Sequence, residues 1–306
     1  MASATLRIRL LGELDLRQGE APVAPLGSAR AESLLAYLLL HRDAPQPRQR
    51  LAFLLWPDSS EPQARTNLRH LLHNLRRALP DPERYLEVTQ RTLRWRDDAP
   101  WWLDVAAFED AIDRADRDGQ AVGALQEAVE LYGGDLLQSG YDEWLLEERE
   151  RLRRRYLEAL ERLAELLEAG GEHARAIGHA ERLLREDPLR EATYRRLMRL
   201  HDARGDRARA LRAYHACAAA LERELNVEPS AATRRAYAAL LPQRAGAAGE
   251  PAAGRASPPC PNQATPPTCG RRPPSWPAPD PGKRPRNAPG TPQRRSWPHI
   301  EERRPR

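Results

Sequence analysis

The side chains best suited to chemistry lie between Gln63 and Leu79, a stretch with many hydrogen-bond donors and no carboxylate. Arginine can bridge O6 and N7 of guanine, asparagine can bridge N6 and N7 of adenine, and both can hold a phosphate. Surface helices normally mix acidic and basic residues. A polar face without acids therefore favours a helix that lies in the major groove of DNA. The candidate contacts on this stretch are Arg65, Thr66, Asn67, Arg69, His70, His73 and Arg77.

Leucines recur in the same stretch at the i, i+3, i+4, i+7 spacing that marks one buried face of a helix. They are Leu68, Leu71, Leu72, Leu75 and Leu79. The preceding Ser60-Glu61-Pro62-Gln63 predicts a capping box, in which the side chains of Ser60 and Gln63 satisfy backbone donors of the first turn. The alternative is a structural helix that packs in the core and whose basic face is only exposed to solvent; it would show the same leucine pattern. His70 and His73 have a spacing that could bind a metal, but no Cys or carboxylate adjoins them and we expect no metal site.

The elements around this helix decide between the two interpretations. Alternation over Leu6–Leu11 predicts a half-buried strand, Leu14–Leu16 a second strand, and the region of Val23 a short third one. Apolar periodicity and breakers then predict two helices and, after the long helix, a hairpin. These are Ala29–His41 with Ser28 as its cap, Arg48–Trp56, and the strands Leu86–Val88 and Leu93–Trp95. This order is that of a winged helix-turn-helix, and Arg91 at the hairpin tip becomes a further candidate DNA contact.

Charge divides the 306 residues into three segments. Residues 1–96 carry a net +5, residues 97–241 carry −8, and residues 242–306 carry +8. We predict a DNA-binding domain, a second domain and a tail with these bounds. The tail contains 17 of the 28 prolines and few large apolar residues, a composition typical of disorder. A passive linker, a basic arm with weak nucleic-acid affinity and an out-of-frame extension of the gene all remain open for it.

The middle segment shows a helical repeat. Gly171–Ile177 matches Gly205–Leu211 at a spacing of 34 residues, which is the period of tetratricopeptide repeats. Ala176 and Ala210 occupy the position at which paired helices approach closely. An α+β winged helix followed by an all-α, tetratricopeptide-like array is therefore the predicted fold. Such arrays commonly contact proteins, so we expect self-association, RNA polymerase or an effector segment as the partner, with a structural spacer as the alternative.

Two groups of motifs resemble a known family. Leu54-Leu55-Trp56-Pro57-Asp58, followed by Arg65-Thr66-Asn67-Leu68-Arg69, resembles the DNA-binding half of the SARP family of bacterial transcriptional activators, which is similar to the OmpR-type winged helix. Tyr132-Gly133-Gly134-Asp135-Leu136 and Asp187-Pro188-Leu189-Arg190-Glu191 resemble the bacterial transcriptional activator domain that follows it in this family. The resemblance spans about residues 6–241. It implies a sequence-specific activator that binds double-stranded DNA at promoters with repeated sites and contacts RNA polymerase.

Several other classes of protein are not expected. No P-loop, H-E-x-x-H or G-x-S-x-G motif occurs, so we predict neither catalysis nor a required cofactor. The winged helix begins at residue 6, so no receiver domain is expected before it. No apolar run is long enough to span a membrane and no signal peptide is visible, which predicts a cytoplasmic protein without a membrane partner. Cys217 lies in an apolar helical pattern and is expected in the core; Cys260 and Cys269 show no metal spacing.

Two alternatives to a DNA-binding activator stay open. The first is an interaction adaptor that works through the repeat array and whose winged helix has lost DNA binding. The second is a fragment of a larger, ATPase-containing regulator, shortened by a frameshift.

Overall fold

The computed structural model describes residues 5–117 and 121–241. The chain begins with a four-stranded sheet in the order β3-β2-β1-β7. Its strands are β1 (Leu6–Arg9), β2 (Asp15–Gln18), β3 (Ala21–Pro22) and β7 (Trp101–Leu103). Leu6 and Ile8 are buried while Arg7 and Arg9 are exposed, so the predicted alternation is confirmed. β7, which pairs parallel to β1 and aligns Leu6 with Trp101, was not predicted because three residues carry too little periodicity.

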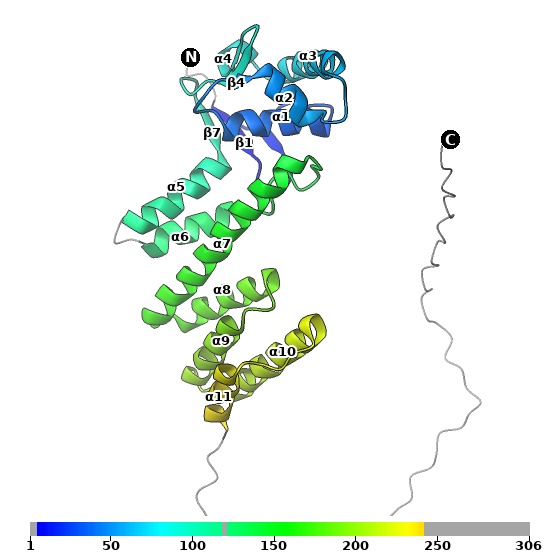
Figure 1. The fold of residues 1–306 in the computed structure, drawn as a ribbon. Coiled ribbons are helices and arrows are strands. Elements are labelled where there is room, and N and C mark those ends of the chain that lie inside the picture. Colours follow the sequence, from blue (N-terminus) through cyan, green and yellow to red (C-terminus); the bar gives the residue numbers. More distant parts are fainter. Residues whose placement is uncertain (1–4, 118–120, 242–306) are drawn as a thin grey trace, which may run out of the picture. The chain divides into compact units, whose positions relative to one another are not determined.

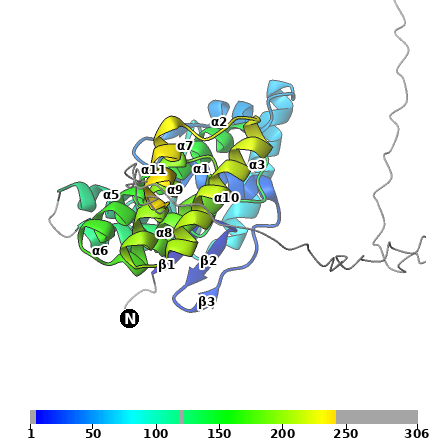
Figure 2. The ribbon, with the colours of Figure 1, turned by 90° about the horizontal axis from the view of Figure 1, so that it is seen from below.

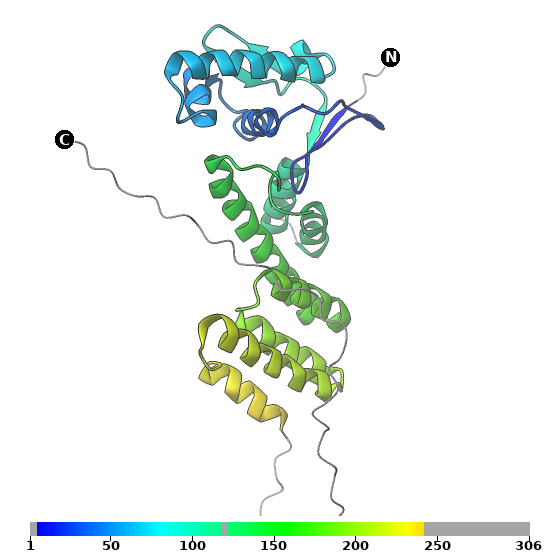
Figure 3. The same ribbon diagram turned by 90° about the vertical axis from the view of Figure 1, so that its right-hand side faces the viewer.

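Three helices and a small second sheet complete the winged helix. The helices are α1 (Ala29–Leu40), α2 (Arg48–Leu55) and α3 (Glu61–Ala78), and the short helix α4 (Pro82–Tyr85) follows them. The sheet has the order β4-β6-β5, from β4 (Gln46–Pro47), β6 (Thr92–Trp95) and β5 (Leu86–Val88). α3 runs across α1, which is seen end-on in Figure 3. The predicted winged helix-turn-helix is confirmed, as are the predicted burial of Leu68, Leu71, Leu72 and Leu75 on α3 and of Leu79, its C-cap residue.

The capping box at the start of α3 was predicted wrongly. Ser60 is the N-cap residue, but its side chain accepts no hydrogen bond from the first turn. The side chain of Gln63, the other member of the predicted box, bonds to a different residue. Its Nε2 donates to Asn67 Oδ1 at 2.8 Å, one turn farther along the helix. The Ser60 carbonyl still accepts from Ala64 N at 2.9 Å, so the helix begins where the sequence indicated.

The helices that follow form hairpins packed side by side (Figures 1 and 2). Figure 1 shows the long α7 beside α5 and α6, with α8 along its other side. α8 and α10 carry the two copies of the 34-residue repeat, and Ala176 and Ala210 are both fully buried, as predicted. The tetratricopeptide-like array is confirmed, and the tail predicted at residues 242–306 lies outside the described residues. The helices are α5 (Asp104–Arg117), α6 (Ala121–Leu131), α7 (Glu143–Ala169), α8 (His173–Glu186), α9 (Glu191–Ala203), α10 (Arg207–Leu225) and α11 (Ala231–Leu240).

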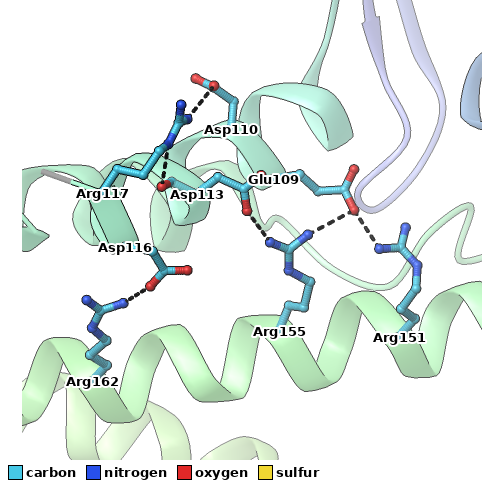
Figure 4. Close-up of polar contacts among 8 residues, drawn as sticks. All are labelled: Glu109, Asp110, Asp113, Asp116, Arg117, Arg151, Arg155 and Arg162. Carbon is cyan, nitrogen blue, oxygen red and sulfur yellow. Dashed lines mark hydrogen bonds and ion pairs between the residues drawn. The ribbon is translucent and has the colours of Figure 1, made fainter.

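Much of the acidity of this array is neutralised within the array itself. Figure 4 shows carboxylates of α5 facing guanidinium groups of α7. Arg155 binds Glu109 at 3.2 Å and Asp113 at 2.7 Å, and Arg151 binds Glu109 at 2.5 Å. These pairs leave the net charge of residues 97–241 unchanged, but they show that the acids along α5 do not form an open acidic surface.

The carboxylate of Asp104 joins the N-terminal sheet to α5. Only 2% exposed, it accepts hydrogen bonds from Leu10 N and Leu11 N at 2.9 Å and from Val105 N at 2.8 Å. Next to it, Leu137 N donates to Leu10 O at 2.8 Å, and Gly12 N donates to Asp135 O at 3.0 Å. The backbone groups of Leu10, Leu11 and Gly12, which directly follow β1, are thus hydrogen-bonded to residues beyond position 96.

We expect that a fragment ending at residue 96 does not fold stably. It lacks β7 and Asp104, so edge groups of β1 and the buried N–H groups of Leu10 and Leu11 lose their partners, at about 1–3 kcal/mol for each unsatisfied group. Thermal unfolding followed by circular dichroism should show a cooperative transition for residues 1–241 and none for residues 1–96. A cooperative transition of the short fragment at a similar temperature would contradict this coupling.

Candidate nucleic-acid interface

A basic hollow lies between α3 and the hairpin of β5 and β6, which we call the wing. Its volume is about 600 Å³. Arginines from three elements line it: Arg48 from the start of α2, Arg65 and Arg69 from α3, and Arg91 from the wing tip. Because these elements are far apart in sequence, only the fold brings the four guanidinium groups to one place.

Hydrogen bonds fix the wing against the start of α2. Arg48 N donates to Arg91 O at 2.8 Å, and Arg48 Nη1 donates to Thr89 O at 3.2 Å. The Thr89 hydroxyl accepts from Arg91 N at 3.2 Å and from Thr92 N at 2.8 Å, which closes the hairpin turn. The backbone of Arg91 is therefore anchored while its side chain stays exposed.

Arg48 is the functional candidate that sequence reasoning missed. It stands at the first position of a short helix whose pattern indicated only burial of leucines, and nothing in the local sequence links it to the wing. Partial burial and the neighbouring charge of Arg69 hold the pKa of its guanidinium below the usual range. Like charges held together in this way favour the binding of an anion.

A second hollow of about 430 Å³ continues the basic surface along α3. Arg48 and Arg69 line this hollow as well, together with His73, Arg76 and Arg77. Arg76 also forms an ion pair with Glu83 of α4, so its charge is partly offset. The sequence pattern did not single out Arg76, because the fold rather than the helical period decides which polar residues face the wing.

The structure divides the eight predicted contact residues into two groups. Arg65, Arg69, His73, Arg77 and Arg91 line the two hollows. Arg65 is held there by Glu61 at 2.5 Å. The others lie on α3 outside the hollow linings: Thr66 donates to Pro62 O at 3.0 Å, half-buried Asn67 accepts from Gln63, and His70 is exposed.

Among the described residues, no group of His, Cys, Asp and Glu side chains is arranged to hold a metal ion, and no helix is long and apolar enough to cross a bilayer. Cys217 is fully buried, as predicted, and burial raises the pKa of its thiol to about 11.

Comparison with known proteins identifies the second domain. Residues 103–241 match the family model of the bacterial transcriptional activator domain. Transcriptional regulatory protein MoaR1 of Mycobacterium tuberculosis is 29% identical over 253 residues, covering 79% of this chain and 81% of its own; MoaR1 of Mycobacterium bovis gives the same values. Residues 103–241 form a bacterial transcriptional activator domain. The resemblance to SARP-type regulators, seen in the sequence motifs, is thereby confirmed.

A solved structure supports the fold of this chain. Mycobacterium tuberculosis EmbR, in complex with a low-affinity phosphopeptide, matches with a TM-score of 0.62 at 24% identity. The match covers 78% of this chain and 65% of the EmbR chain, so this chain spans less than two thirds of that protein. At this identity the match bears on the fold alone.

Proposed function

We propose that this SARP-type regulator binds double-stranded DNA with α3 in the major groove and the wing tip at the adjacent groove. The observation that carries the proposal is the convergence of Arg48, Arg65, Arg69 and Arg91 on one hollow. Guanidinium groups bind phosphate oxygens through paired hydrogen bonds, and a duplex offers phosphates on both sides of the groove that a helix enters.

Individual roles follow from position. Arg48, Arg69 and Arg91, between helix and wing, meet the phosphate backbone. Thr66, Asn67 and His70 lie outside the hollows, and we assign them to base edges. Asn67 must give up its bond with Gln63 to pair with adenine. Arg65 in the first hollow, and His73 and Arg77 in the second, complete the interface.

The same proposal assigns residues 1–96 to DNA binding and residues 97–241 to activation. The division is one of roles, because a continuous hydrophobic core extends from Leu6 to Leu200. The activator domain contacts RNA polymerase at promoters with repeated sites, or a second copy of the chain, and the regulator acts in the cytoplasm without catalysis or a cofactor.

Selection of bound DNA from a random pool by the full chain tests this proposal. We expect enrichment of a short motif that recurs at a fixed spacing. The logarithm of the binding constant for this motif should fall linearly with the logarithm of salt concentration, with a slope of about −0.9 per neutralised phosphate. The lack of any enriched motif, together with binding that is insensitive to salt, would favour an adaptor whose winged helix is structural.

A further inference from the structure

An open groove of about 520 Å³ lies between α8 and α10, with α9 as its floor. The floor is apolar at Tyr194 and Leu197, both more than nine-tenths buried, and half-buried Leu184 of α8 and Ala213 of α10 extend it to the sides. It belongs to the repeat array and shares no residue with the basic hollows near the wing.

Unpaired positive charge stands on both walls of the groove. Arg185 on α8 and Arg212 on α10 are exposed, and neither forms a hydrogen bond or ion pair within the described part of the chain. A third guanidinium, that of Arg209, is bound by Asp206 at 3.2 Å. Glu181 is the carboxylate among the lining residues, so arginines outnumber acids in the lining by three to one.

His201 of α9 adds a polar ring to the floor. Its residue is 5% exposed, and its ring makes no hydrogen bond with any described residue. Burial holds the pKa of the ring below its usual range, although the charge of Asp206 opposes that shift. The ring nitrogens are not among the buried atoms that lack a partner, so they are open to the groove and can bond to a ligand that lies in it.

We propose that this groove binds a peptide segment in which an acidic side chain stands between apolar ones. The carboxylate lies between Arg185 and Arg212, the apolar side chains cover Leu184 and Leu197, and His201 bonds to the peptide backbone. This is a partner site of the activator domain and does not depend on DNA binding. The chain's own residues 242–306 do not fit as the occupant, because they carry 12 basic and 4 acidic residues, the same sign of charge as the walls.

Random peptides displayed on phage and selected on the immobilised full chain test this site. We expect the enriched peptides to combine Asp or Glu with Leu or an aromatic residue. Arg185→Glu with Arg212→Glu should weaken their binding by about tenfold or more, since repulsion replaces attraction at both walls. Arg154→Glu with Arg207→Glu is the matched control, because it makes the same charge change at exposed arginines outside the groove.

Three outcomes would overturn the proposal. The first is enrichment of basic peptides, or of none. The second is equal loss of binding in both double variants, which indicates non-specific attraction. The third is sedimentation showing a dimer for the wild type and a monomer for Arg185→Gln with Arg212→Gln, which assigns the groove to a second copy of the chain. Thermal melts of all variants exclude misfolding as the cause.

Discussion

Replacing Asp104 with alanine is expected to destabilise the chain by about 3 kcal/mol or more, because it leaves the buried N–H groups of Leu10 and Leu11 without an acceptor. For a domain of this size such a loss lowers the melting temperature by about 10 °C. The effect should be seen in urea unfolding of residues 1–241 as a lower midpoint with an unchanged slope. Asp98→Ala removes an exposed carboxylate nearby and should change stability by no more than about 0.5 kcal/mol.

The pH dependence of stability provides an independent readout of the same carboxylate. Burial raises the pKa of Asp104, and the backbone N–H groups of Leu10, Leu11 and Val105 oppose that shift without cancelling it. Because the pKa of Asp104 is higher in the folded state than in the unfolded state, this residue favours folding most at low pH. Its contribution to the free energy of unfolding is lost as the pH rises through the folded-state pKa. Asp104→Asn should remove that step. A variant that keeps the wild-type melting temperature and pH profile would contradict a stabilising role for the contacts of Asp104 with Leu10 and Leu11.

Loss of Arg48 and Arg69 together is expected to weaken DNA binding by about a hundredfold, because a phosphate or base contact made by arginine contributes about 1–3 kcal/mol. Both residues line both hollows, so no neighbouring hollow compensates for their removal. The salt dependence of log K should also become shallower by about 1 for each arginine that neutralises a phosphate. Fluorescence anisotropy with the selected DNA at several salt concentrations measures both quantities.

The control for this experiment is Arg207→Ala, which removes one exposed arginine from α10 and should leave affinity and salt slope unchanged. Arg48→Ala alone is the more informative single variant, since the structure and not the sequence pattern points to it. Wild-type affinity and slope in the Arg48, Arg69 double variant would refute the placement of DNA between α3 and the wing.

The sequence was sufficient wherever a local pattern matched its structural period. Alternation identified β1, the leucine spacing identified α3, and the repeat of Gly171–Ile177 at Gly205–Leu211 identified the paired helices of the array. The absence of acids between Gln63 and Leu79 identified the helix that carries most of the candidate interface. Each of these signals is contained within one element or one repeat, so no knowledge of tertiary contacts was needed to read it.

Tertiary structure alone decided the features that depend on contacts between distant segments. It brought Arg48 to the wing, gave β1 a parallel partner from residues 101–103, and turned Asp104 into an acceptor for Leu10 and Leu11. It also paired the acids of α5 with the arginines of α7, a pairing that the net charge of the segment does not reveal. The physical reason is common to all four: hydrogen bonds and ion pairs form between groups that are close in space, and a linear pattern records only groups that are close along the chain.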